Sequence, residues 1–249
     1  MNRASFRFYA ELNDFLPEER RQRPFQVSFR GKVTVKHLVE SLGVPHSEID
    51  LILIDGESVD FTRVVEDGDS VSVYPVFESI DISPVGRLRP NPLRESRFVL
   101  DIHLGQLATY LRLLGFDTLY QNDFDDSELA KISSEERRIL LTKDRGVLKR
   151  NLVTHGYCVR EIDPQLQLQE VIRRFDLQTS IAPFQRCLKC NGKLEPVEKE
   201  KILDRLEHNT SLYYDDFRIC LQCSQIYWKG SHYSRMLQFL EEVLEPDVQ

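Results

Sequence analysis

Two short runs, at residues 98–100 and 138–142, have apolar residues at their centre and are followed by an aspartate, Asp101 directly and Asp144 after one residue. Runs of this length without a polar break predict strands that are buried on both faces, as in a parallel sheet. Ligands of such sheets bind beyond the carboxyl ends of the strands. Asp101 and Asp144 are expected at these ends. The pattern therefore predicts a parallel sheet with two carboxylates at its ligand-binding edge.

The segment between these runs predicts the helices that such a sheet needs. Apolar residues at helical spacing over residues 104–114 predict a helix that Gly115 ends, and residues 117–120 predict a second strand. Asp126 then begins another amphipathic helix. Strand, helix, strand, helix and strand in succession are typical of an α/β unit.

Acidic residues accompany the ends of these predicted strands. Carboxylates at adjacent strand ends repel one another unless a cation lies between them. With Asp101, Asp144 and the acidic helix entry at Asp125, Asp126 and Glu128, the economical cation is Mg²⁺ or Mn²⁺. The alternative is that each acid is a solvated loop residue or a helix cap, where negative charge is also favoured. We expect Asp101, Asp126 and Asp144 to be the ligands.

The first third of the chain predicts a small α+β domain at residues 1–82. Its predicted elements are a helix at residues 34–42, with Thr34 as N-cap, and strands at residues 4–12, 24–29, 49–54 and 70–76. This order resembles the ubiquitin-like β-grasp fold of small sulfur-carrier proteins. A sulfur carrier needs a Gly-Gly carboxyl terminus, whereas this chain continues past residue 79 into more protein. We therefore expect an adaptor or stabilising module, with a protein partner as its possible ligand.

Residues 83–96 hold three prolines and lack periodicity, so they predict a linker whose three arginines either contact RNA or are solvated. The α/β domain then covers residues 97–180 and ends with a strand at 156–162 and a helix at 164–175. A third unit covers residues 181–240.

Four of the five cysteines form two Cys-x-x-Cys pairs, Cys187 with Cys190 and Cys220 with Cys223. Four thiolates complete the tetrahedral shell of a structural Zn²⁺ and leave no open position. An iron–sulfur centre and redox-active thiols are the alternatives. The segment between the pairs is rich in Lys and Glu and poor in large apolar residues, so we expect this unit to need the metal to fold. Cys158 is expected to be a buried filler.

Residues 227–233, just after the second pair, combine three aromatic residues with lysine, serine and histidine. We predict that Lys229, Ser231 and His232 contact RNA, because such a mixture can stack on bases and hold phosphates. The alternative is that Trp228 and its neighbour pack the metal-binding unit against the α/β domain.

The 249 residues are 41% hydrophobic and 29% charged, which suits two or three small domains. The net charge of −7 is concentrated in residues 1–84, which hold 15 acidic and 9 basic residues, whereas the remainder holds 25 and 24. Charge therefore neither indicates nor excludes a nucleic-acid partner. The cysteine spacing, the polar amino-terminal segment and the lack of a long apolar run predict a cytoplasmic protein without a membrane span.

A family resemblance rests on five stretches that follow one another in the expected order: FVLDIHLGQLATYLRLLGFDT, DDSELA, RILLTKDR, RCLKCNGKLEPVEKE and YWKGSHY. With these stretches, residues 97–235 resemble the Mut7-C ribonuclease family, a PIN-like nuclease domain with a carboxyl-terminal zinc ribbon. Residues 4–82 resemble the ubiquitin-like domain that is often fused in front of it. The fold implied is a β-grasp domain, a PIN-like parallel α/β sheet and a small four-cysteine zinc ribbon.

The resemblance implies RNA cleavage by an acidic cluster that binds Mg²⁺ or Mn²⁺, with Asp101, Asp126 and Asp144 in the matching positions. Many PIN nucleases have a fourth acid close behind the last of these. Arg145 and Gly146 stand there in this chain. The fourth ligand is then water or another residue, or the metal is held weakly.

The function predicted is a metal-dependent ribonuclease whose zinc ribbon aids RNA binding. Lys143 or Arg145 could hold a phosphate beside the acids, and Arg112, on the helix that begins next to Asp101, is a third candidate. One alternative is a non-catalytic RNA-binding or protein-adaptor factor with a vestigial acid cluster. Another is a PIN-type toxin, which the additional domains make the weaker hypothesis.

Overall fold

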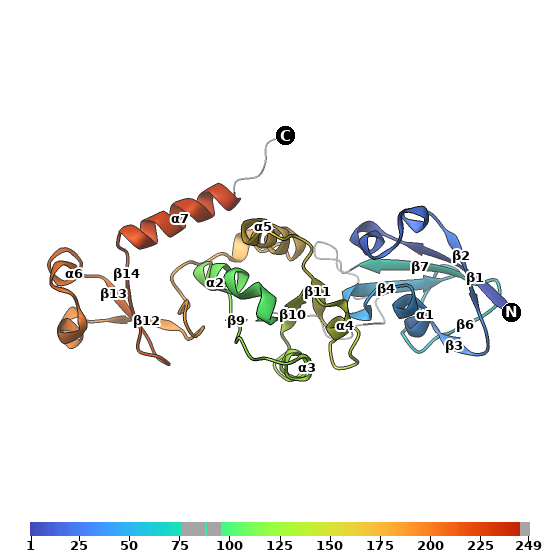
Figure 1. Ribbon diagram of the computed structural model, residues 1–249, viewed down its shortest axis with the longest axis horizontal. Coiled ribbons are helices and arrows are strands. Elements are labelled where there is room, and N and C mark those ends of the chain that lie inside the picture. Colours follow the sequence, from blue (N-terminus) through green and yellow to red (C-terminus); the bar gives the residue numbers. More distant parts are fainter. Residues whose placement is uncertain (76–87, 89–95, 245–249) are drawn as a thin grey trace. The chain divides into compact units, whose positions relative to one another are not determined.

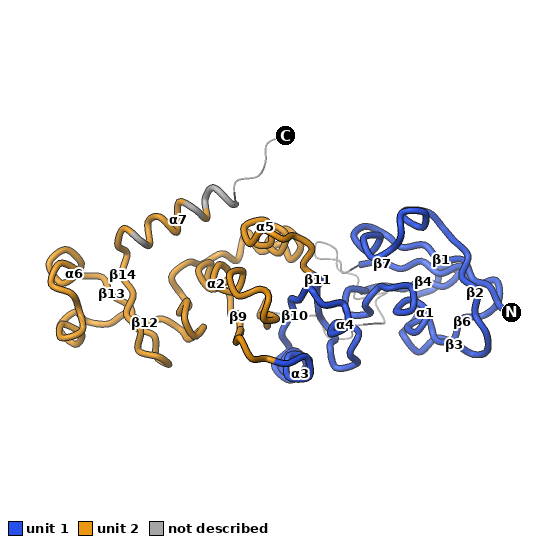
Figure 2. Tube along the Cα trace, in the orientation of Figure 1, with its two compact units in different colours: residues 1–95, 125–158 blue, residues 96–124, 159–249 orange. Residues whose placement is uncertain are grey.

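The computed structural model describes residues 1–75, 88 and 96–244, so most of the predicted linker lies outside the described residues. Figure 1 labels the elements. The chain forms two compact units, each built from two segments, and Figure 2 colours them separately. Unit 1 comprises residues 1–95 and 125–158, and unit 2 comprises residues 96–124 and 159–249. Because the units interleave along the sequence, the predicted linear domains stay a prediction.

The first segment of unit 1 is a β-grasp domain. Its elements are β1 (Asn2–Phe8), η1 (Ala10–Phe15), η2 (Glu18–Arg20), β2 (Phe25–Phe29), β3 (Val33–Thr34), α1 (Val35–Ser41), η3 (His46–Glu48), β4 (Ile49–Ile54), β5 (Glu57–Ser58), β6 (Val64–Val65) and β7 (Ser70–Pro75). The main sheet has the order β2-β1-β7-β4-β5, in which β1 and β7 pair in parallel and the outer pairs are antiparallel. This arrangement confirms the predicted fold.

Local chemistry explains how these elements begin and end. The hydroxyl of Thr34 accepts a hydrogen bond from the backbone N–H of His37, which makes it the predicted N-cap of α1. The strand predicted at residues 4–12 ends instead at Phe8. The Asn13 side chain donates to the carbonyls of Phe8 and Ala10 and so holds the chain in the 3-10 turns of η1.

The second segment of unit 1 contains α3 (Asp126–Glu135), β10 (Ile139–Thr142), α4 (Arg145–Leu148) and β11 (Gly156–Cys158). All four residues of β10 are buried, and β10 pairs in parallel with β11, as its continuous apolar run predicts. The strand predicted at 156–162 ends at Cys158. There the backbone N–H of Cys158 donates to the carboxylate of Glu48 at 2.6 Å, a buried contact with the β-grasp segment.

Unit 2 begins with β8 (Phe98–Leu100), η4 (Ile102–Leu104), α2 (Gly105–Leu113) and β9 (Thr118–Leu119), and continues after residue 159 with α5 (Pro164–Arg174) and η5 (Gln178–Ser180). β8 and β9 pair in parallel, and α2 packs against α5. Gly115 ends α2 as predicted. Its φ is +96°, and a Cβ atom there would lie 2.1 Å from the carbonyl oxygen of Ala182, so only glycine fits.

The remainder of unit 2 is a ribbon followed by a helix. Its elements are β12 (Leu194–Val197), η6 (Lys199–Lys201), η7 (Leu203–Arg205), α6 (His208–Tyr213), β13 (Phe217–Cys220), β14 (Ile226–Trp228) and α7 (Ser231–Leu244). The strands form an antiparallel sheet in the order β12-β13-β14. Ile202, Phe217 and Ile226 build a small buried core, so the ribbon has more apolar packing than the sequence pattern predicts. In the described part of the chain, no helix is both long and apolar enough to cross a bilayer.

Candidate functional site

The first Cys-x-x-Cys pair lies in a tight turn before β12. The backbone N–H of Cys187 donates to the carbonyl of Gly192 at 2.8 Å, and the N–H of Asn191 donates back to the carbonyl of Cys187 at 2.9 Å. Asn191 has a φ of +68°, a conformation that asparagine tolerates better than most residues. The next residue, Gly192, has no room for a side chain, because a Cβ atom there would lie 2.7 Å from the sulfur of Cys220.

The second pair lies in a turn with the same hydrogen bonds between β13 and β14. The N–H of Cys220 donates to the carbonyl of Gln225 at 2.9 Å, and the N–H of Ser224 donates to the carbonyl of Cys220 at 2.9 Å. Ser224, with a φ of +58°, corresponds to Asn191 of the first turn. Two equivalent turns thus present one pair of thiols each.

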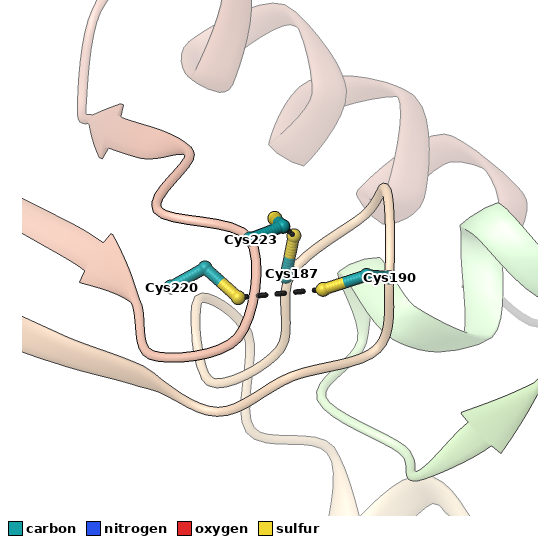
Figure 3. Close-up of side chains that lie close together, drawn as sticks. All are labelled: Cys187, Cys190, Cys220 and Cys223. Atoms are coloured by element: carbon teal, nitrogen blue, oxygen red, sulfur yellow. Dashed lines mark hydrogen bonds between the residues drawn. The ribbon is translucent and has the colours of Figure 1, made fainter.

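The four sulfur atoms come together between these turns (Figure 3). All lie within 4.8 Å of one another, with 3.5 Å between Cys187 and Cys223 and 3.4 Å between Cys190 and Cys220. Zinc–sulfur bonds of about 2.3 Å in a tetrahedron imply sulfur separations of about 3.8 Å. Among the described residues this is the one group of three or more His, Cys, Asp or Glu side chains arranged to hold a metal ion. The residues therefore fit a four-thiolate metal centre.

The Tyr227 hydroxyl lies 3.1 Å from the sulfur of Cys187 and accepts a hydrogen bond from the N–H of Leu188. Burial by itself raises the pKa of Cys187, but the hydrogen bonds from Tyr227 and from the backbone of Cys190 outweigh it and bring that pKa to about 7. Burial raises the pKa of Cys190 to about 12. Cys187 therefore ionises more readily than Cys190 before a metal binds.

Arg112 of α2 connects the first turn to the parallel strands of unit 2. Its side chain is 4% exposed and donates to the carbonyls of Thr118, Leu188, Lys189 and Tyr120, at 2.9, 3.0, 3.3 and 3.5 Å. Burial lowers the pKa of Arg112, while Cys187 and Cys190 oppose that shift. A guanidinium that is buried and holds four carbonyls is engaged within the protein, so we assign Arg112 a structural role in place of the predicted RNA contact.

Asn191 and Arg186 extend the same junction. The Asn191 side chain accepts from the N–H of Thr118 at 2.8 Å and donates to Asp117 at 2.7 Å. Arg186 pairs with the other oxygen of Asp117 at 3.2 Å. These contacts fix the metal turn at the start of β9. The ribbon thus packs on the α/β fold through Asn191 and Arg186, which are not the residues that the alternative interpretation named.

Asp101 follows β8 directly in unit 2. Its carboxylate is 5% exposed, and one oxygen accepts a hydrogen bond from the N–H of His103 at 2.8 Å as the N-cap of η4. The buried strand and the cap together fix the orientation of this carboxylate.

The acidic entry to α3 in unit 1 divides between two roles. Asp125 is the N-cap and accepts from the hydroxyl and N–H of Ser127 and the N–H of Glu128, and these hydrogen bonds lower its pKa. Asp126, the next residue, is exposed and lies 3.5 Å from a guanidinium nitrogen of Arg150. Asp125 is thus committed to the helix, and Asp126 presents its carboxylate at the surface of unit 1.

Asp144 follows β10 in unit 1 and caps α4, with its Oδ1 atom accepting from the N–H of Gly146 at 2.6 Å. Arg145 is exposed, and its guanidinium stacks on the ring of Phe15. Lys143 is half-buried, and its carbonyl lies 3.9 Å from the sulfur of Cys158, which is buried as predicted. Asp126 and Asp144 belong to unit 1 and Asp101 to unit 2, so the convergence of all three stays a prediction.

The predicted RNA contacts of the ribbon lie where β14 gives way to α7. Lys229 is exposed, with its amine 3.9 Å from Asp216 and 5.8 Å from the ring centroid of Phe184. Ser231 is the first residue of α7. The side chain of His232 lies outside the described part of the structure.

Several residues of this site carried no signal in the sequence. Asn191 indicates only a turn, and Asp117 only a strand boundary. Phe184 indicates nothing by itself, although its ring contacts both Tyr233 and Arg218. An isolated aromatic before a metal turn is a weak signal, and only the fold shows what it contacts.

Two family models match this chain. Residues 96–240 match the Mut7-C RNAse domain and residues 1–81 match the Mut7-C ubiquitin domain. The exonuclease mut-7 homolog of Homo sapiens is 34% identical over 106 residues, which are 40% of this chain and 12% of that protein. The solved structure of SAMP1 from Haloferax volcanii aligns over 32% of this chain and 100% of its own, with 16% identity and a TM-score of 0.26.

The two domain matches run through both compact units, and the first covers the capped aspartates and the four-thiol centre alike. A β-grasp segment, parallel strands that end at acids, and paired metal turns in this order have a common explanation. The chain belongs to the Mut7-C RNAse domain family, a nuclease family, and carries a Mut7-C ubiquitin domain in its first 81 residues.

Proposed function

We propose that this chain is a metal-dependent ribonuclease that cleaves RNA phosphodiester bonds with Asp101, Asp126 and Asp144. The observation that carries the proposal is the position of two acids after buried strands of parallel pairs. Asp101 follows β8 directly, and Asp144 follows β10 after one intervening residue. Ligands of parallel sheets bind at that end of the strands. Membership of the Mut7-C RNAse domain family supports RNA cleavage as the reaction of these carboxylates.

The donor atoms suit Mg²⁺ or Mn²⁺, which prefer carboxylate oxygens. Asp101 and Asp144 each use one oxygen as a helix cap, and this hydrogen bond orients the second oxygen of the group. When bound, one or two such ions lower the pKa of a water molecule and offset charge on the leaving oxygen.

The neighbouring cations have a separate role. We propose that Arg145 and Lys143 hold a phosphate of the RNA next to Asp144, and that Lys229 and Ser231, with His232, hold the strand further along.

The four cysteines hold a structural Zn²⁺ that stabilises the fold of the ribbon. The Mut7-C ubiquitin domain is the proposed surface for a protein partner, and the cytoplasm is the proposed compartment.

The test is cleavage of labelled single-stranded RNA by the full chain in Mn²⁺, Mg²⁺ or EDTA. Cleavage is expected with either ion and not in EDTA, and Asp101→Asn and Asp144→Asn should reduce it to background. The matched control is Asp60→Asn, since Asp60 accepts hydrogen bonds from Thr62 in a similar turn of the β-grasp domain. Equal cleavage by all three variants would refute the proposal.

One observation favours a second function, that of an RNA-binding factor with vestigial acids. Asp126 pairs with Arg150, and Asp101 and Asp144 cap helices, so each acid has a structural use. RNA binding that persists in EDTA, without cleavage in Mn²⁺ or Mg²⁺, would support this function.

A further inference from the structure

Unit 2 contains a cavity of about 670 Å³ beside the metal turns. Its walls come from the first turn, β14, the end of α6, the start of α7 and Leu113 of α2. Cavities of roughly 300–1,000 Å³ are the usual size of small-molecule sites. The volume is therefore sufficient for one nucleotide.

Five aromatic residues line this cavity: Phe184, Tyr214, Tyr227, Trp228 and Tyr233. The rings of Phe184 and Tyr233 lie 5.0 Å apart, and those of Tyr214 and Trp228 lie 6.5 Å apart. Nucleobases stack on the faces of aromatic rings. Tyr214, Trp228 and Tyr233 are partly exposed, whereas Phe184 is buried beneath two cations.

The charge of the lining is opposite to that of the chain. The described lining residues include no Asp or Glu, although the chain carries a net charge of −7. Of the two cations in the lining, Arg186 is paired with Asp117, whereas Lys189 is exposed. Arg218 and Lys229 lie 5.2 and 5.8 Å from the Phe184 ring centroid. A flat ligand with an anionic group fits both the aromatic walls and the cations.

Polar side chains complete the lining. Thr210, Gln225 and Ser231 place hydroxyl and amide groups among the rings, and Thr210 is buried. Such groups donate and accept hydrogen bonds at the edge of a base, which a purely apolar groove for a peptide side chain would not need.

We propose that this cavity binds one unpaired nucleobase of an RNA strand, stacked among its aromatic residues, with the adjoining phosphate held by Lys189. The proposal rests on the proposed function for the nature of the polymer, and it deepens that function by giving the ribbon a site for a single-stranded segment.

Trp228 is the only tryptophan of the chain and lines the cavity, so its fluorescence reports occupancy directly. The experiment titrates the full, zinc-loaded Asp101→Asn chain, without added Mg²⁺ or Mn²⁺, with a short single-stranded RNA, AMP, UMP, ribose 5-phosphate and inorganic phosphate. Saturable quenching is expected from the RNA and both nucleotides and not from the two base-free phosphates. Equal quenching by ribose 5-phosphate, or none by RNA, would overturn the proposal.

Two variants test the walls and the cation separately. Tyr233→Leu removes a ring and Lys189→Ala removes a charge, and each should weaken RNA binding by about 5-fold or more, the scale of one stacked base. The matched control is Tyr213→Leu, because Tyr213 is 78% exposed on α6 and does not line the cavity. Lys189 is exposed, so the fold should tolerate Lys189→Ala. Unchanged affinity for RNA in both Lys189→Ala and Tyr233→Leu would refute the site.

These results are distinguishable from the fate of the proposed function. If RNA quenches the Trp228 fluorescence but the wild-type chain does not cleave RNA in Mn²⁺, the cavity is supported and the nuclease proposal is contradicted. Cleavage without quenching supports the nuclease and rejects the cavity.

Discussion

The guanidinium carbon of Arg145 lies 4.8 Å from the ring centroid of Phe15. Phe15 belongs to the β-grasp segment, and Arg145 follows Asp144 directly. A ubiquitin-like domain thus holds the cation next to a proposed catalytic carboxylate, inside one compact unit.

Phe15→Leu should release Arg145 from this stacking. If Arg145 holds a phosphate of the RNA, the KM for RNA should rise a few fold with little change in kcat, because an unrestrained side chain loses more entropy on binding. Steady-state cleavage kinetics measure both. Phe25→Leu is the control, since Phe25 stacks with Arg20 in the same domain at 5.1 Å. A similar rise in KM in both variants would point to a general loss of domain stability.

Cys187→Ser and Cys220→Ser should each release about one metal ion per chain and unfold the ribbon, because three thiolates do not complete a four-thiolate shell. Elemental analysis measures the metal, and thermal denaturation measures the folding. Cys158→Ser provides the control, since Cys158 is buried outside the cluster. Full metal content in both ribbon variants would contradict the assignment of the centre.

Tyr227→Phe should weaken zinc binding in a pH-dependent way. The pKa of Cys187 is lowered from 9.0 to about 7, against the effect of burial, in part by the Tyr227 hydroxyl. Because the pKa of Cys187 is lower in the folded chain than in the unfolded chain, its thiolate stabilises the fold above the unfolded-state pKa. This contribution is lost as the pH falls through about 7. Removal of the hydroxyl raises the pKa, so protons compete with zinc up to a higher pH.

Chelator competition from about pH 6.5 to 9 measures this effect. The difference between Tyr227→Phe and the wild type should be largest at the acid end of this range and should shrink toward pH 9, where protons compete less with zinc in both proteins. Tyr213→Phe, on exposed α6, should follow the wild type throughout. A difference that does not depend on pH would mean that the hydroxyl acts on packing instead.

Arg112→Met should destabilise unit 2 by about 2–4 kcal/mol, because buried carbonyls lose their donors and the thiolates lose a nearby cation. Chemical denaturation with a zinc-loaded chain measures the free energy of unfolding. Arg235→Met, on an exposed part of α7, should change it little. If Arg112 contacts RNA as the sequence suggested, Arg112→Met would weaken RNA binding with no loss of stability.

Asp144→Asn should change the stability of the metal-free chain little, because asparagine also caps helices. Addition of Mn²⁺ should raise the Tm of the wild type by mass action and raise that of the variant less. Asp126→Asn breaks an exposed pair with Arg150 and should cost under about 1 kcal/mol. Thermal melts with and without Mn²⁺ check both, and an equal response of wild type and Asp144→Asn would argue against a metal at this residue.

The sequence predicted those parts of the fold that local patterns determine. Thr34 and Gly115 mark helix ends by their own chemistry, and the apolar run of β10 is buried on both faces as expected. The spacing of the cysteines was enough to predict their gathering, because each tight turn brings two of them together. The predicted positions of Asp101 and Asp144 after strands are confirmed, whereas their metal stays a prediction.

Long-range contacts could not be predicted. Arg112 looked like a helix-surface cation, because helical spacing does not reveal that the metal turn, more than 70 residues later, covers it. The α7 helix was missed, since the segment Tyr227 to Tyr233 was interpreted by its side-chain chemistry alone. The aromatic cavity likewise combines residues from five separate elements, and no window of the sequence contains it.

The hydrogen bond from Cys158 to Glu48 has a consequence for the outer side of β11. β11 is the last strand on its side of β10, and exposed strand edges are templates on which other chains can add a strand. The β-grasp segment occupies one of these edge groups with the Glu48 carboxylate. A chain shortened to begin after residue 82 would expose this edge, and its characteristic failure would be self-association by strand addition, at a concentration where the full chain stays monodisperse.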